Sequence, residues 1–293
     1  MSFSGTYTAL VTPFSSRRID EKAFERLVRK QISGGVDGIV PVGTTGESAT
    51  LDYEEHLRII ALSVKLAAGK MKVIAGTGAN STQEAIYLTR EAEKLGADAS
   101  LQVAPYYNKP TQEGLYRHMR AVARSTRLPI ILYSIPGRCG IEIAVDTVRR
   151  LAHDCANVVG IKEAGGNPDR VSQLRAALGR GFTILSGDDS LTLPFMAVGA
   201  QGVVSVASNV IPRDVTRMVN AYASGNVALA LRLHDRYFSL FRDLFIESNP
   251  GPAKAALAMM GQMRDELRLP MVPISAASRV RLRKTMKACG ILK

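Results

Sequence analysis

The chain has 293 residues, of which 46% are hydrophobic, and its formal net charge is +12 at pH 7. No stretch approaches the roughly 18 uncharged apolar residues of a membrane-spanning helix, so no membrane span is predicted. The basic residues are spread along the chain apart from the run Arg279–Lys284, and no zinc-finger, RRM or basic-zipper pattern is present, which argues against nucleic-acid binding.

Cysteine and histidine usage gives no sign of a metal centre. Cys139, Cys155 and Cys289 have neither zinc-ligand spacing nor a CxxC pair, and the four histidines form no HExxH or similar motif. The segment Met1–Gly5 has no basic stretch followed by an apolar one, so we expect no signal peptide. We therefore expect free thiols, no metal and a cytoplasmic location.

Short apolar runs and helical periodicity alternate along the chain. The predicted strands, in chain order, are 5–14, 38–43, 72–75, 99–103, 129–133, 158–162, 182–186 and 202–206. The predicted helices between them are 20–33, 52–68, 81–96, 112–124, 145–153, 168–178 and 191–198. Beyond Pro212 only helices are predicted, at 213–223, 226–246, 252–261 and 275–288.

Eight strands, each followed by a helix, predict a (β/α)8 TIM barrel. A doubly wound sheet is the rival arrangement, but it would carry a GxGxxG turn after the first strand, which this sequence lacks. We predict a barrel catalytic domain at residues 1–224 and an appended C-terminal helical domain at 225–293.

Polar residues gather where the predicted strands end, which is the edge that carries the active site in such barrels. By the strand bounds above, no His, Asp or Glu lies directly at the end of strands two to six. The site therefore has neither the ligands of a metal aldolase nor a Ser-His-Asp triad. The strand-end residues include Thr44, Thr45, Asn80, Tyr106, Tyr107, Tyr133, Arg138, Lys162, Gly187 and Ser205.

Lys162 ends a mostly apolar strand, where burial would disfavour its charged form. A neutral amine attacks carbonyl carbons to form a Schiff base. The alternative is a lysine that simply reaches solvent at a strand end. Imine formation needs a proton relay, which the hydroxyls of Tyr133, Thr44 and Tyr107 can supply because each donates and accepts.

The same edge can bind carboxylates. The adjacent backbone N–H groups of Thr44 and Thr45 can hold one, and the guanidinium of Arg138 can grip a second. Alternatively, Arg138 pairs with Glu47 or Asp188.

Six motifs carry a resemblance that covers essentially the whole chain. They are GTTGES at 43–48, GTGANST at 76–82, PYYNKPTQEGLY at 105–116, YSIPGR at 133–138, GIKEAGGN at 160–167 and SGDD at 186–189. With them the chain resembles the lysine-dependent pyruvate aldolases and lyases, the family typified by dihydrodipicolinate synthase that also includes N-acetylneuraminate lyase.

The resemblance implies that Lys162 forms a Schiff base with pyruvate and that no other cofactor is needed. It implies a relay of Tyr133, Thr44 and Tyr107, the last from a neighbouring subunit of a homotetramer built from two tight dimers. Thr45, Gly187 and the Val204 carbonyl would bind substrate, and Arg138 would meet the carboxylate of L-aspartate 4-semialdehyde. The product would be a hydroxylated tetrahydrodipicolinate, on the route to diaminopimelate and lysine.

Gly137 and Arg138 favour that condensation over its closest alternative, a class I aldolase that cleaves a 2-keto-3-deoxy acid or N-acetylneuraminate to give pyruvate. A barrel that binds a metabolite without catalysis is the alternative from a different class. Cys139 replaces the usual Thr or Ser and Ser134 a common Asn, which puts fine specificity in question and removes no catalytic group.

In lysine-inhibited members of the family, an allosteric pocket lies at the tight dimer interface. The positions that match it all have the expected residue types, namely Ser48, Ala49, His56, Asn80, Glu84 and Tyr106. Tyr53 replaces an often-found histidine. For Glu84 the plain alternative is a capping box with Ser81 at a helix start, and for His56 it is an exposed helix position.

Overall fold

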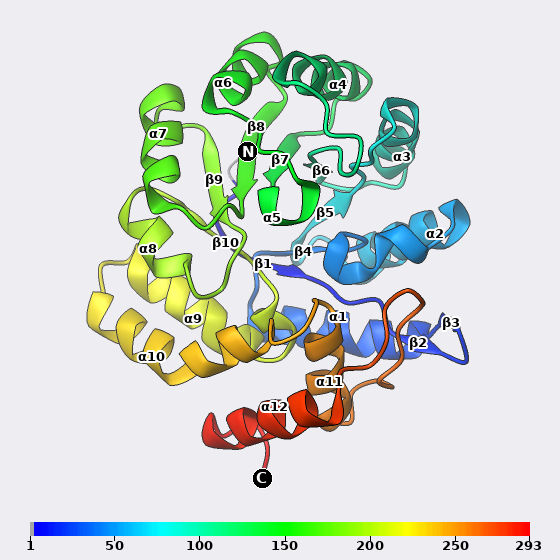
Figure 1. Cartoon of the computed structure of the whole chain (residues 1–293), viewed down its shortest axis with the longest axis vertical. Helices are drawn as coiled ribbons and strands as arrows, with labels where there is room; N and C mark the ends of the chain where they lie inside the picture. The colour runs from blue at the N-terminus through cyan, green and yellow to red at the C-terminus, as the bar shows by residue number, and fades with distance from the viewer. Residues whose placement is uncertain (1–2) are drawn as a thin grey trace.

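Eight parallel strands close into a barrel at the centre of the molecule, as Figure 1 shows for a computed structural model that describes residues 3–293. The order around the barrel is β1-β10-β9-β8-β7-β6-β5-β4, and β4 pairs back onto β1. Their bounds are β1 (Gly5–Ala9), β4 (Gly38–Val40), β5 (Lys72–Gly76), β6 (Ala99–Val103), β7 (Ile130–Ser134), β8 (Val158–Glu163), β9 (Thr183–Ser186) and β10 (Gly202–Ser205). The predicted TIM barrel is confirmed. Met1 and Ser2, which begin the segment considered for a signal peptide, lie outside the described residues.

Helices surround the barrel (Figure 1) and bury one apolar face each against the strands. Asp52 starts one of them with the predicted capping box, in which its side chain accepts from Glu55 N at 2.8 Å. At Ser81 only half of the predicted box forms, because Ser81 Oγ accepts from Glu84 N and no return bond is made within residues 3–293. The helices are α1 (Glu21–Gly34), α2 (Tyr53–Ala67), α3 (Thr82–Lys94), α4 (Gln112–Arg124), α6 (Val145–Asp154), α7 (Pro168–Leu178) and α8 (Thr192–Ala197).

The last part of the chain is helical, as predicted. Its helices are α9 (Pro212–Ala223), α10 (Val227–Asp243), α11 (Gly251–Met259) and α12 (Ala276–Ala288). α9 packs against α1 and completes the ring, while α11 and α12 pack on each other. Apolar side chains of α11 belong to the same core as those of the barrel strands. The division at residue 224 stays a prediction.

Several local features differ from the prediction, including a hairpin after the first strand and a helical turn after β7. The first strand ends at Ala9, and the chain then forms a small hairpin of β2 (Phe14–Ser15) and β3 (Arg18–Ile19). A single helical turn, α5 (Pro136–Cys139), follows β7 and was not predicted. Both are too short to produce a hydrophobic period in the sequence.

The pairing of β7 with β8 contains an irregularity that fixes the site. Ile130 pairs with Val158 but Ile131 pairs with Gly160, so β8 has one extra residue at this point. Beyond it the register is regular, and Tyr133 stands directly beside Lys162.

Within residues 3–293 no helix combines the length and the apolar character that crossing a bilayer requires.

Candidate active site

A cavity of about 330 Å³ opens at the carboxyl ends of the barrel strands. Five of the predicted catalytic and substrate-binding residues line it, and the C-terminal segment closes one side with Asn249, Pro250, Pro270 and Met271. Chain segments far apart in sequence therefore meet where a barrel enzyme carries its site. The five are Thr44, Thr45, Tyr133, Arg138 and Lys162.

Lys162 projects into this cavity from the end of β8 and does not reach open solvent. It is 7% exposed, and its Nζ lies 4.0 Å from the centroid of the Tyr133 ring. Burial lowers the pKa of Lys162 to about 7; the nearby Arg138 acts in the same direction, and the Asp189 carboxylate opposes both. A large fraction of the amine is therefore neutral at neutral pH, which is the nucleophilic form.

Tyr133 and Thr44 stand together beside the lysine. The Thr44 side chain is hydrogen-bonded to the Tyr133 hydroxyl, and burial raises the pKa of Tyr133 above its usual range. The phenol therefore keeps its proton at neutral pH and can both donate and accept. This geometry suits two of the three predicted relay hydroxyls.

The loop that carries Thr44 and Thr45 is held from the C-terminal segment. Asn249 Nδ2 donates to Thr45 Oγ1 at 2.9 Å. Two residues on, Glu47 takes a left-handed backbone conformation with φ of 56°, which is strained for a residue other than glycine. Its carboxylate is bonded to Lys254 Nζ and accepts from Arg268 N at 3.1 Å.

Sequence reasoning missed this buried pair. Lys254 is 0% exposed and lies within α11, whose other residues are all apolar. A lysine in a run of alanine and leucine predicts a buried cation that needs an acid, but nothing in the spacing names Glu47, which lies 207 residues away.

Arg138 lies on α5 at the rim of the cavity, and Nη2 donates to the Asn249 carbonyl at 3.1 Å. The alternative partners do not reach it: Glu47 is bonded to Lys254, and Asp188 Oδ1 accepts from Ser190. Within residues 3–293 the guanidinium of Arg138 makes no ion pair, so its other N–H groups are available to an anionic ligand.

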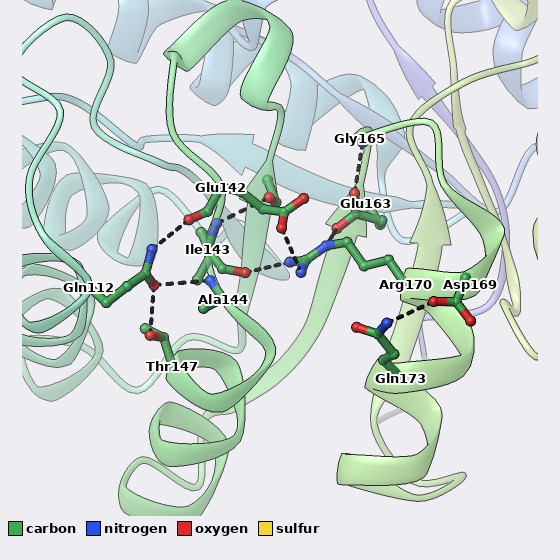
Figure 2. Close-up of polar contacts among 11 residues, drawn as sticks. Gln112, Glu142, Ile143, Ala144, Thr147, Glu163, Gly165, Asp169, Arg170 and Gln173 are labelled. Atoms are coloured by element: carbon green, nitrogen blue, oxygen red, sulfur yellow. Dashed lines mark hydrogen bonds and ion pairs between the residues drawn. The ribbon is translucent and has the colours of Figure 1, made fainter.

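One statement about the strand ends is wrong. β8 runs one residue further than predicted and ends in Glu163, an acid directly after Lys162. Because side chains alternate along a strand, Glu163 faces away from the cavity and bonds Arg170 Nε of α7 at 2.8 Å (Figure 2). It therefore supplies no acid or metal ligand to the cavity.

A second acid, Asp189, acts on the lysine through its charge and had no assigned role. It is buried and accepts from Ser205 Oγ, from Val206 N at 3.0 Å and from Ala207 N at 3.0 Å. Burial raises the pKa of Asp189 to about 6, and the hydrogen bond from Ser205 opposes that rise. Its charge favours the protonated form of Lys162 and so moderates the effect of burial.

Gly187 and Val204 lie near the site and outside the cavity lining. A Cβ on Gly187 would stand 2.6 Å from Ala164 Cβ and 3.1 Å from Lys162 Cε, so only glycine leaves room for the lysine stem. Val204 is buried in β10 beside Tyr7 of β1. Their roles as substrate contacts stay predictions.

Tyr107 does not reach the cavity of its own chain. Its side chain is 91% exposed, and the backbone has a φ of 74°. The neighbouring Tyr106 does line the cavity. The role of Tyr107 in a relay therefore depends on a second copy and stays a prediction.

The residues predicted for lysine binding fall into two groups. Ser48, Ala49 and Tyr106 line the cavity. Asn80 Nδ2 donates to the Tyr106 carbonyl at 3.4 Å, and the charge of Glu84 contributes to a raised pKa of Tyr106, for which burial is the larger cause. The alternative prediction, that His56 occupies an exposed helix position, is wrong.

His56 is buried and bonded. Its Nε2 lies 2.8 Å from the Gly76 carbonyl, and desolvation lowers its pKa to about 4. The ring is therefore neutral near pH 7, with Nε2–H as the donor. It ties α2 to the end of β5.

A (β/α)8 barrel whose inward lysine has a lowered pKa, beside a protonated tyrosine, defines the class of Schiff-base-forming aldolases and lyases. The chain belongs to the dihydrodipicolinate synthetase family, whose model matches residues 2–289. The resemblance drawn from the motifs is confirmed, and the protein is an enzyme of the lyase type.

Individual relatives agree along the whole chain. The 4-hydroxy-tetrahydrodipicolinate synthase of Thermodesulfovibrio yellowstonii is 49% identical over 291 residues, which is 99% of this chain and 100% of the relative. The solved synthase of Methylacidiphilum fumariolicum SolV is 56% identical with a TM-score of 0.98, covering 99% of this chain and 96% of the other. A lysine-bound synthase structure from Cyanidioschyzon merolae is 45% identical with a TM-score of 0.96 and covers 99% of each chain.

Proposed function

We propose that this protein is a 4-hydroxy-tetrahydrodipicolinate synthase, which condenses pyruvate with L-aspartate 4-semialdehyde on the route to diaminopimelate and lysine. The observation that carries the proposal is one cavity holding a partly neutral Lys162 and a guanidinium, Arg138, without an ion-pair partner among residues 3–293. The named activity of the full-length relatives supports the same reaction.

The first half of the reaction forms an imine. Lys162 Nζ attacks the ketone carbon of pyruvate, and the resulting carbinolamine loses water. Tyr133 and Thr44 carry the protons that this step moves, since their hydroxyls are bonded to one another. The pyruvate carboxylate is held at Thr45, which Asn249 fixes. The protonated imine is the electron sink, so the reaction uses no metal or other cofactor.

The second half joins the two substrates. The imine loses a methyl proton to give an enamine, whose carbon attacks the aldehyde of the semialdehyde, and the new alkoxide takes up a proton. Arg138 holds the semialdehyde carboxylate meanwhile. The substrate amine then attacks the imine carbon and displaces the Lys162 amine, which closes the ring and frees the enzyme. The net reaction releases one water.

Arg138→Ala tests which aldehyde the enzyme uses. We expect kcat/KM for the semialdehyde to fall on the order of 100-fold, because charge-assisted hydrogen bonds to the carboxylate are lost. A coupled assay with pyruvate measures the rate. Arg149→Ala, which removes an exposed arginine on α6, is the matched control and should leave it unchanged. Full activity with a 2-keto-3-deoxy acid and none with the semialdehyde would instead favour the aldolase alternative.

The assembly we propose is a cytoplasmic homotetramer of two tight dimers, in which Tyr107 completes the relay of the neighbouring subunit. Two observations support this. Tyr107 is almost fully exposed and is held in a left-handed conformation, which places a large apolar ring in solvent in the single chain.

L-Lysine is the inhibitor we propose, bound by the group that includes Asn80, Glu84 and Tyr106. Initial rates at rising lysine should fall in the millimolar range. Glu84→Gln should weaken the inhibition, because it removes the charge that would face a lysine ammonium while keeping the side-chain shape. A rate that stays flat up to tens of millimolar lysine would reject this site.

A further inference from the structure

The short segment Gly140–Ala144 connects α5, which carries Arg138, to α6. It has no regular secondary structure. Helical hydrogen bonds reach only its ends, where Gly140 N donates to the Pro136 carbonyl and the Ala144 carbonyl accepts from Val148 N, so the polar groups between them need other partners. The preceding helix, α5, is a single turn of four residues, which is too short to be stable without support from its surroundings. The position of Arg138 therefore depends on what fixes this segment, in addition to the hydrogen bond from its Nη2 to the Asn249 carbonyl.

Arg170 of α7 fixes the segment from one side (Figure 2). Its Nη2 is bonded to the Ile143 carbonyl, and its Nη1 lies 3.1 Å from Glu142 Oε2. The third contact, from Nε to Glu163 Oε2 at 2.8 Å, reaches the end of β8. One guanidinium thus joins the strand that carries Lys162 to the segment that follows Arg138.

The clamp is completed from the opposite side by Gln112 at the start of α4. Its Nε2 donates to the Glu142 carbonyl at 2.8 Å, and its Oε1 accepts from Ala144 N at 3.0 Å. Ile143 N donates to Ser134 Oγ of β7 at 3.3 Å, which ties the segment back to the barrel. Figure 2 shows the segment held between α4 and α7.

The guanidinium of Arg170 is buried, which is costly unless every donor is well used. If residue 170 only formed a salt bridge with Glu163, a lysine would serve as well as an arginine, because a point charge is enough to pair with one acid. The planar fork does more, because it contacts an acid of β8 and a carbonyl of a different element at fixed angles. Beyond pairing with Glu163, the guanidinium of Arg170 therefore fixes the position of the segment Gly140–Ala144.

We propose that Arg170 is a positioning residue that sets the location of Arg138 and so the affinity for the carboxylate of the second substrate. This inference rests on the proposed function of Arg138. Arg170 is 5% exposed, lies outside the barrel and touches no cavity-lining residue through its three contacts. Its influence acts through the segment and not through direct contact with substrate.

Arg170→Lys tests the proposal with the charge beside Glu163 retained. We expect KM for the semialdehyde to rise on the order of tenfold to a hundredfold, the scale of a misplacement near 1 Å. Borohydride trapping of the pyruvate imine on Lys162 should keep its wild-type extent. Gln173→Ala is the control, because Gln173 lies exposed on the same helix and, among residues 3–293, its side chain hydrogen-bonds Asp169 alone, at 2.7 Å (Figure 2).

A double-mutant cycle separates positioning from a general structural role. In an Arg138→Ala background, Arg170→Lys should change KM for the semialdehyde less than twofold, because the residue through which it acts is gone. Effects that multiply, an unchanged KM in the single variant, or a parallel loss of imine trapping would each overturn the proposal. If Arg170→Lys does not fold, Gln112→Ala loosens the same segment and should raise the same KM.

These outcomes are distinct from failure of the proposed function. If the wild-type enzyme consumes no semialdehyde, the proposed reaction is rejected, whatever the effect of Arg170→Lys. If the wild-type enzyme consumes the semialdehyde and Arg170→Lys leaves KM unchanged, only the positioning role of Arg170 is rejected.

Discussion

Lys162→Met should leave a folded protein whose condensation rate is lower by at least about 10⁴-fold, the scale of losing a covalent nucleophile. Methionine fills nearly the same volume but has no amine to attack pyruvate. Initial rates in the coupled assay measure the loss. After borohydride reduction with pyruvate, intact-mass measurement should show a covalent adduct on the wild type and none on the variant.

The variant should melt no lower than the wild type. Burial lowers the pKa of Lys162 to about 7, so the folded state disfavours its charged form, and this cost is fully present below pH 7 and declines as the pH rises toward the ordinary value. Methionine removes that cost. Loss of activity with an unchanged melting temperature therefore reports chemistry and not unfolding.

A second buried lysine makes the adduct assignment necessary. Burial also lowers the pKa of Lys254, to about 8, although its bond to Glu47 opposes the change. Lys254 is held by that carboxylate and does not line the cavity. Peptide mapping of the wild-type adduct should find Lys162, and an adduct that persists in Lys162→Met would contradict its role.

Lys254→Met should destabilise the fold by about 3 to 5 kcal/mol, because it leaves the Glu47 carboxylate buried without its partner. Urea unfolding with linear extrapolation measures this difference. We also expect KM for pyruvate to rise, since Glu47 anchors the loop that carries Thr45. Arg150→Met breaks the exposed pair with Glu113 and should leave the free energy of unfolding almost unchanged, because solvent screens that pair.

The neutral double variant Glu47→Gln with Lys254→Met sharpens this result. Removing both charges should recover much of the lost stability, because no unpaired charge stays in the interior. A single variant as stable as the wild type would show that the pair contributes nothing to holding the loop.

The regular elements followed from local sequence. The strand 99–103 and the helix 112–124 were predicted with the bounds that the structure has, because an apolar run and a helical period are both local signals. Asp52 and Glu55 likewise marked a helix start that formed as predicted. The single turn α5 gave no such signal, although it carries Arg138.

The site was predicted as far as the barrel topology reaches. Counting strands placed Lys162, Tyr133 and Thr44 at one mouth, and the structure brings them together. Long-range ion pairs were beyond that reasoning. With 38 basic and 26 acidic residues in the chain, many pairings are compatible with the sequence, and only the fold selects Glu47 for Lys254.

The extra residue in β8 has a consequence for which mutations the chain tolerates. Lys162 and Glu163 are neighbours, and their side chains face opposite sides of the barrel wall. Val159 is the extra residue, and its deletion would leave a regular ladder with Lys162 still beside Tyr133. Deleting Ile161, beyond the bulge, would instead put Glu163 beside Tyr133, because a shift of one position flips every later side chain. The mouth would then carry an acid that repels two carboxylate substrates, and the amine would face the helices outside the barrel. A single-codon deletion at the bulge therefore keeps the sign of the catalytic charge, whereas one two residues later reverses it.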